Sequence, residues 1–150
     1  MEKTVTTAPT LGHEDRQEIL DLISNYSYTY DAQDIDAFVA LFAEDAEWAA
    51  YLRSTPAITL HGREELRQNL GARMRDHATK GTTSRHYQTN TILTSVGEGR
   101  VDGITMVLVL WQTLGEREPR PAHTGYYRDT FVKGGTGWKF LKRVAHIDHE

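Results

Sequence analysis

The sequence of 150 residues contains no cysteine, which excludes disulfide bonds, thiolate nucleophiles and cysteine-ligated metal sites. It also lacks a long apolar run, since no stretch approaches the ~20 residues that a membrane-spanning helix needs. The segment from Met1 to Thr10 has no hydrophobic core, so no secretory signal is expected there. We therefore expect a cytoplasmic protein with no membrane partner.

Positive charge is also scarce. The chain has 17 Lys and Arg residues against 21 Asp and Glu residues, a net charge of -4, and no long basic run, so we expect no nucleic-acid partner. The length fits one domain with a real core. Residues 1–11 carry Thr, Ala and Pro without periodicity. They predict a flexible tail in front of a single domain at 12–150.

Helical periodicity dominates the first half of the chain. Apolar residues at helical spacing predict helices at about 13–30, 35–43 and 63–77, with Asp34 as the N-cap of the second. The stripe of the first helix consists of Ile19, Leu22, Ile23, Tyr26 and Tyr30.

The second half of the chain reads as strands. Short strands are expected at 46–52 and 57–60, with Pro56 as an interruption, and four longer strands follow at about 85–96, 100–114, 122–133 and 138–147. Helices first and antiparallel strands later predict an α+β fold, with the helices packed on one face of a sheet.

Two motifs carry a resemblance to a known family. The run from Tyr26 to Trp48, with Tyr30-Asp31, Leu41-Phe42 and a closing Asp-Ala-Glu-Trp, resembles the opening of the SnoaL-like branch of the NTF2-like superfamily. Residues 85–90, Arg-His-Tyr-Gln-Thr-Asn, are similar to the His-x-x-x-Asn strand of that family. The resemblance implies a cone-shaped α+β barrel: a strongly curved, mostly antiparallel sheet, with a cavity that the first helix closes.

The strongest candidate chemistry is a pair of residues. Asp31 stands at the C-terminal end of a helix, where the helix dipole opposes its charge, so it needs a partner, and His86 is the best candidate. His86, Gln88 and Asn90 share one polar strand face, which is either a pocket wall or a solvated edge. The resemblance implies a dyad in which His86 is the general base and Asp31 fixes its tautomer and stabilises the imidazolium.

Other candidates are less specific. Tyr26 matches a position that holds a catalytic Tyr or Lys in some relatives, although a core Tyr is as good an interpretation. Packing is the alternative for the aromatic residues, and an exposed ion pair is the alternative for Arg143. The expected substrate-binding residues are Tyr30, Trp48, Tyr51, Gln88, Asn90, His123, Tyr127 and Arg143.

Neither a metal nor another cofactor is expected. The His-rich end from His146 to Glu150 has no fixed partner elsewhere in the sequence, so a frayed terminus is the better interpretation. The sequence also lacks a Gly-rich phosphate loop and the Gly-x-Ser-x-Gly and His-Glu-x-x-His motifs.

The resemblance implies a cofactor-independent lyase or isomerase, a dehydratase or cyclase. It would act by Asp–His acid–base catalysis on a small hydrophobic oxygenated substrate such as a polyketide intermediate. Two alternatives stay open: a non-catalytic binding or assembly module, such as a dioxygenase small subunit, and an epoxide hydrolase, whose Asp-Arg-Asp cluster has no clear counterpart here. Apolar residues on both sides of the strand at 100–114 predict a homodimer or higher homo-oligomer through the outer sheet face.

Overall fold

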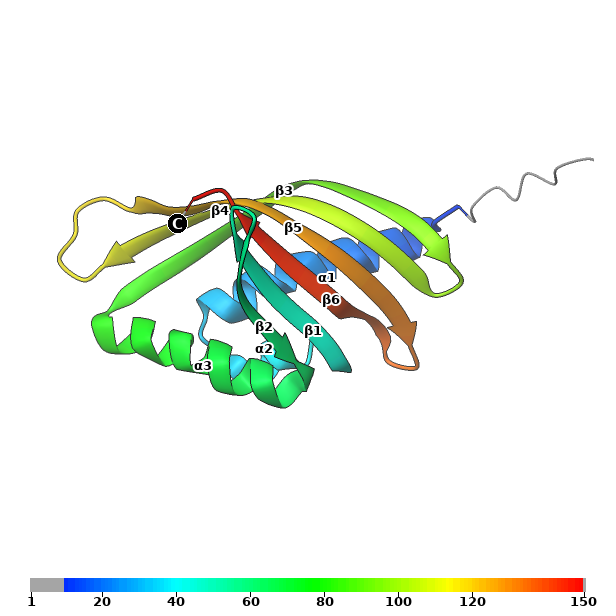
Figure 1. Ribbon diagram of the computed structural model, residues 1–150, viewed down its shortest axis with the longest axis horizontal. Helices are drawn as coiled ribbons and strands as arrows, with labels where there is room; N and C mark the ends of the chain where they lie inside the picture. The colour runs from blue at the N-terminus through cyan, green and yellow to red at the C-terminus, as the bar shows by residue number, and fades with distance from the viewer. Residues whose placement is uncertain (1–9, 150) are drawn as a thin grey trace, which may run out of the picture.

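A computed structural model of the chain describes residues 10–149 and contains three helices and six strands (Figure 1). The predicted α+β class is confirmed. The predicted tail lies mostly outside the described residues, and Leu11 at its end packs partly buried against the core. The elements are α1 (His13–Asp31), α2 (Ile35–Val39), β1 (Phe42–Leu52), β2 (Thr55–His61), α3 (Gly62–Lys80), β3 (Thr82–Gly97), β4 (Arg100–Thr113), β5 (Arg120–Gly134) and β6 (Gly137–Ile147).

The six strands form one sheet in the order β2-β1-β6-β5-β4-β3. The pairing of β1 with β6 is parallel and the other four pairings are antiparallel. Figure 1 shows the sheet arching over the helices, with α1 beneath it and α3 set off beside β2 and the start of β3. The sheet is therefore curved and mostly antiparallel, with the helices on its concave side, as expected.

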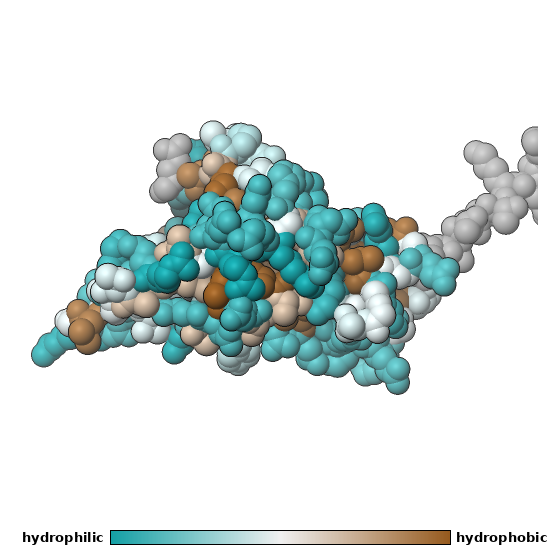
Figure 2. All heavy atoms as spheres, turned by 90° about the horizontal axis from the view of Figure 1, so that it is seen from below, coloured by the Kyte–Doolittle hydropathy of each residue, from teal (hydrophilic) through white to brown (hydrophobic). Residues whose placement is uncertain are grey.

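The core lies between α1 and the concave face of the sheet. Ile19, Ile23 and Tyr26 of the α1 stripe are buried, because the helical period puts them on the side that faces the strands. Phe38 and Phe140 join them from α2 and β6. The face seen from below in Figure 2 is mostly hydrophilic, with apolar side chains visible between polar ones.

The second helix is shorter than predicted. Asp34 caps it as expected, accepting from the Ala37 amide at 3.0 Å, but the helix ends at Val39. The carbonyl of Leu41 accepts from the amide of Phe140 at 3.0 Å, so the chain is drawn into pairing with β6 and the strand begins at Phe42. Strand pairing thus overrides a helical apolar pattern.

The C-terminal end is also more ordered than predicted. His146 belongs to β6, and its ring is stacked between Tyr51 and Tyr126, with centroid distances of 5.4 Å and 4.8 Å. The amide of Asp148 donates to the carbonyl of Thr124 at 3.0 Å. None of the described helices is both long and apolar enough to cross a membrane.

Candidate active site

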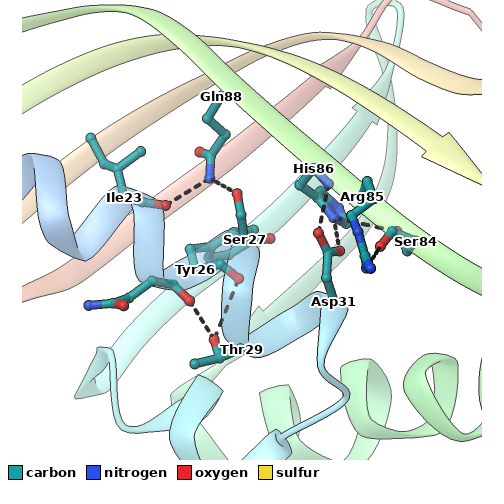
Figure 3. Close-up of polar contacts among 10 residues, drawn as sticks. Ile23, Tyr26, Ser27, Thr29, Asp31, Ser84, Arg85, His86 and Gln88 are labelled. Atoms are coloured by element: carbon teal, nitrogen blue, oxygen red, sulfur yellow. Dashed lines mark hydrogen bonds and ion pairs between the residues drawn. The ribbon is translucent and has the colours of Figure 1, made fainter.

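The central contact of the site joins the last residue of α1 to β3. Nδ1 of His86 lies 2.6 Å from Oδ1 of Asp31, and the His86 amide donates to Oδ2 at 2.8 Å (Figure 3). The last turn of α1 has no basic residue, so His86 is the partner that the Asp31 carboxylate needs. The two side chains are only about a tenth exposed. The contact expected from the sequence is therefore present.

This contact fixes the chemistry of the imidazole. Because the carboxylate accepts at Nδ1, the neutral ring carries its proton there and Nε2 is left with a free lone pair. Within residues 10–149, Nε2 of His86 forms no hydrogen bond. The His86 side chain lines a cavity of about 600 Å³, within the usual range for small-molecule sites. The ring can accept a proton from a molecule held in this cavity.

The dyad also borders the outside of the molecule. His86 and Asp31 also line a groove between α1 and β3, together with Ser24 and the exposed Tyr28. The His86 side chain therefore borders both the inner cavity and this groove. Asp31 is on the groove side and does not line the cavity.

Two tyrosines of α1 lie beside His86 in the cavity wall. The Tyr26 hydroxyl accepts from Nε1 of Trp48 at 3.1 Å, and its ring is buried. The Tyr30 ring meets His86 edge to face, with 4.9 Å between centroids. Burial raises the pKa of Tyr26 and raises the pKa of Tyr30 to about 12, so both remain neutral hydroxyls near neutral pH.

Two histidines pack against Trp111, which lies on β4 in the cavity wall. His123 and His77 each meet the indole edge to face, at 5.1 Å and 4.9 Å. All three residues line the cavity. Burial lowers the pKa of both histidines, and the positive charge of Arg73 contributes at His123. In both histidines the neutral form is therefore favoured more than in a free histidine.

Of the eight substrate-binding candidates, Tyr30, Trp48, His123 and Tyr127 line the cavity, whereas Tyr51, Gln88, Asn90 and Arg143 do not. Tyr51 faces the other side of the sheet, against His146. The Gln88 amide donates to the Ile23 carbonyl at 2.8 Å and to the Ser27 hydroxyl at 2.7 Å, fastening β3 to α1 (Figure 3).

Asn90, which also does not line the cavity, is exposed. It has a φ of 56° at an irregularity of the β3–β4 pairing between Thr89 and Ile92. The strict alternation behind the predicted polar face ends at this bulge. Neither Gln88 nor Asn90 lines the cavity as predicted: the Gln88 amide is bonded to α1, and Asn90 lies at the bulge.

Arg143 does not reach the cavity mouth either. It is fully buried and binds Asp129 through Nε and Nη2, both at 2.8 Å. The guanidinium packs 4.1 Å from the ring centroid of Tyr26 and 4.0 Å from that of Tyr127. Arg143 therefore has a structural role. It does not form an exposed ion pair, and it does not line the cavity.

Sequence reasoning missed the contribution of α3. Arg73, Asp76 and His77 line the cavity from this helix. The signal was the stripe of Leu66, Leu70 and Met74: one more turn of the same periodicity reaches His77. Among residues 10–149, no group of three or more His, Asp or Glu side chains is placed to hold a metal ion.

The SnoaL-like domain family matches residues 13–144. No curated protein matches the chain. The fold is similar to that of ActVI-ORFA from Streptomyces coelicolor, with 21% identity, coverage of 93% of this chain and 98% of that chain, and a TM-score of 0.81. A putative scytalone dehydratase from Novosphingobium aromaticivorans has 25% identity, coverage of 89% and 84%, and a TM-score of 0.72.

The same fold also occurs in a different kind of protein. The beta subunit of a putative aromatic-ring-hydroxylating dioxygenase from Novosphingobium aromaticivorans is 19% identical, with coverage of 89% of both chains and a TM-score of 0.75. The fold is therefore shared by a putative dehydratase and by a putative dioxygenase subunit, and the side chains of the site have to distinguish these roles.

Proposed function

The chain belongs to the SnoaL-like family, and from this premise we propose that it is a cofactor-independent lyase or isomerase, a dehydratase or cyclase. One observation carries the proposal. The Asp31–His86 pair, 2.6 Å apart, presents a free imidazole nitrogen to a largely apolar cavity of about 600 Å³. A buried carboxylate behind a histidine is the arrangement that a general base requires.

The proposed reaction begins with proton removal by His86. Nε2 takes a proton from a carbon next to a carbonyl group, and the Asp31 carboxylate stabilises the imidazolium that forms. In a β-hydroxy ketone the electron pair of that C–H bond forms the new double bond as the hydroxyl leaves. The imidazolium returns its proton to the leaving oxygen, so the products are the unsaturated ketone and water.

A hydroxyl group of α1 would assist at the carbonyl oxygen. Tyr26 accepts a hydrogen bond from Trp48 and still carries a proton of its own that it can donate. The raised pKa of Tyr26 keeps that proton in place near neutral pH. A neutral donor aimed at a developing enolate oxygen is the usual form of such stabilisation. Tyr30, whose pKa is also raised, lines the same cavity and is the second candidate donor to the carbonyl oxygen.

The cavity walls favour a flat, hydrophobic, oxygenated substrate such as an aromatic polyketide intermediate. Trp48 and Trp111 line the cavity, and aromatic rings bind flat apolar molecules well. The likeness to a putative scytalone dehydratase at 25% identity supports dehydration as the first reaction to test. The proposed partners are this small molecule and further copies of the chain.

A second candidate is a non-catalytic binding or assembly module. It is favoured by the likeness to the dioxygenase beta subunit, at 19% identity. Such a module has no need for a carboxylate held 2.6 Å from a cavity histidine. The dyad therefore favours catalysis.

The test uses 3-hydroxy-1-tetralone, a bicyclic β-hydroxy ketone that becomes 1-naphthol when it loses water. The wild type should produce 1-naphthol, because the unsaturated ketone formed first becomes aromatic by a proton shift from carbon to oxygen. His86→Gln should not produce it, whereas His61→Gln, on a side chain that is 65% exposed outside the cavity, should behave as the wild type. Equal 1-naphthol formation in His86→Gln, or none in the wild type, would contradict the proposed dehydratase.

A further inference from the structure

We propose that the substrate is an acid, and that Arg73 on α3 binds its carboxylate at the cavity mouth while the reacting carbon lies at His86. The inference rests on the proposed function only in taking the cavity as the substrate site. Its basis is the position of Arg73 on its helix, the pairing of the charges around it, and the side chains next to its guanidinium.

Arg73 interrupts an inward-facing helical stripe. At 100° per residue, Arg73 lies about 20° from Leu66 around the α3 axis, and His77 lies about 20° to the other side. Leu66, Leu70 and Met74 are buried on this side of the helix. The stripe becomes polar where α3 leaves the core and lines the cavity, so the cation lies at the exposed mouth of the site.

Most cations of α3 have an acidic partner, and Arg73 does not. Arg63 pairs with Glu44 at 3.3 Å, Arg67 pairs with Asp36, and Lys80 pairs with Asp76 at 2.7 Å. Within residues 10–149, Arg73 forms no ion pair.

Among the cavity-lining side chains of residues 10–149, Arg73 is therefore the one cation without an acidic partner. The acidic residue of the cavity, Asp76, already faces Lys80, and the catalytic candidate, His86, already faces Asp31. His77 and His123 are held neutral by burial. A bound carboxylate would complete the charge balance with Arg73, and guanidinium groups bind carboxylates with two parallel hydrogen bonds.

The surroundings of Arg73 suit an aromatic acid. Its guanidinium lies 5.7 Å from the ring centroid of Trp48, at the edge of the aromatic wall. Its charge lowers the pKa of His123 and partly offsets the rise at Tyr30, so the charge acts across the cavity and not only at its rim. An apolar ring against Trp48 would place a carboxylate substituent next to the guanidinium.

The test compares two probes of nearly the same shape, the anion 2-naphthoate and the neutral 2-naphthamide, by titration calorimetry. The wild type should bind the acid about tenfold more tightly than the amide, which is the lower range for a charge-assisted hydrogen bond. Arg73→Gln should remove this preference, and Arg73→Lys should retain part of it. The preference of the wild type should weaken as salt is added, because Arg73 is exposed at the mouth.

Arg75 is the matched control. It lies on the opposite side of α3, about 180° from Leu66, and does not line the cavity. It also forms no ion pair among the described residues, so Arg75→Gln changes the net charge equally and should keep the acid preference. Equal losses in the two variants, no preference in the wild type, or no binding of either probe would overturn the inference.

The same titration on His86→Ala separates this inference from the proposed reaction. The acid preference should survive in that variant, because Arg73 and not the dyad creates it. Loss of the preference in His86→Ala would overturn the assignment to Arg73. A preserved preference in a protein without dehydratase activity would refute the reaction and leave the acid-binding site standing.

Discussion

Arg143 and Asp129 form a two-point ion pair inside the hydrophobic core, with both hydrogen bonds at 2.8 Å and neither side chain exposed. The pair joins β5 to β6, where the two residues stand opposite each other in the strand register. The guanidinium supports the rings of Tyr26 and Tyr127, which line the cavity. The stability of the fold and the shape of the cavity wall therefore depend on the same contact.

Asp129→Asn should destabilise the protein strongly. The variant leaves the Arg143 guanidinium buried without a countercharge, and breaking such a pair costs ~3–5 kcal/mol of unfolding free energy. Glu47→Gln, which breaks the more exposed pair with Lys142 at 2.8 Å, should cost less than ~1 kcal/mol. Urea unfolding of both variants checks this, and similar losses would argue against a special role of the buried pair.

Gly125→Ala should also destabilise the protein, for a steric reason. A Cβ atom at Gly125 would lie 2.0 Å from the carbonyl oxygen of His146 on the neighbouring strand, so the backbone of β5 or β6 has to move. Overpacking of this kind costs ~1–3 kcal/mol or more. Gly134→Ala is the control because a Cβ there meets nothing within 4 Å. Melting temperatures that fall equally in both variants would contradict this explanation.

The sequence predicted the central contact because physical need and pattern agreed. A carboxylate at the C-terminal end of α1 has no basic residue in its own last turn, and His86 stands on a polar strand face. The order of helices and strands followed in the same way from the apolar periodicity. The periodicity is a local signal, whereas the contact between Asp31 and His86, which are 55 residues apart, was predicted with the help of the resemblance.

What the sequence did not predict depends on contacts between distant segments. The pairing of β3 with β4 shifts after Thr89, so simple alternation fails to place Asn90. Tyr51 was expected in the cavity although alternation from Trp48 puts it on the other face of β1, as the structure has it. Arg143 looked exposed because its partner is fourteen residues away on another strand. Arg73 was missed because a charge next to an apolar stripe is usually solvated.

The outer sheet face should hold two copies of the chain together. Met106 and Leu108 are 56% and 37% exposed there, next to Ile92 at 64%, and isolated chains rarely expose such a group of apolar residues. Light scattering of the wild type should give at least twice the chain mass of 17.0 kDa. Met106→Glu/Leu108→Glu should give a monomer.

Leu114→Glu provides the control for this assembly. Leu114 is 89% exposed, but it lies beyond the end of β4 and does not line the groove around Met106. This variant should assemble as the wild type does. A monomeric wild type at micromolar concentration would refute the expected oligomer.

The unfolding free energy should depend on pH partly through His123. Burial, with His86 and Arg73 nearby, lowers the pKa of His123 in the folded state below the ~6.5 of an unfolded chain. Between these two pKa values the unfolded state binds more protons, so stability rises with pH and is lost as pH falls below ~6.5. Urea unfolding at pH 5.5 and 7.5 should show a smaller difference in His123→Gln than in the wild type. An unchanged difference would contradict this contribution.

The dyad should behave as one unit in catalysis. His86→Ala removes the base and should lower turnover of 3-hydroxy-1-tetralone by at least ~10²-fold, the lower end of general-base contributions. Asp31→Asn should also lower turnover severely, because an amide cannot stabilise an imidazolium and can select the wrong tautomer. The double variant should be little worse than the worse single variant, since the second substitution removes a function that is already lost.

Melting curves of the same variants separate catalysis from folding. His86→Ala should lower the melting temperature only modestly, because the imidazole faces a cavity and not a packed core. Asp31 accepts from both the ring and the backbone amide of His86, so Asp31→Asn keeps an oxygen for one of these bonds and should remain folded. Near-normal turnover in His86→Ala, or activity lost only through unfolding, would make the pair structural and favour the binding module.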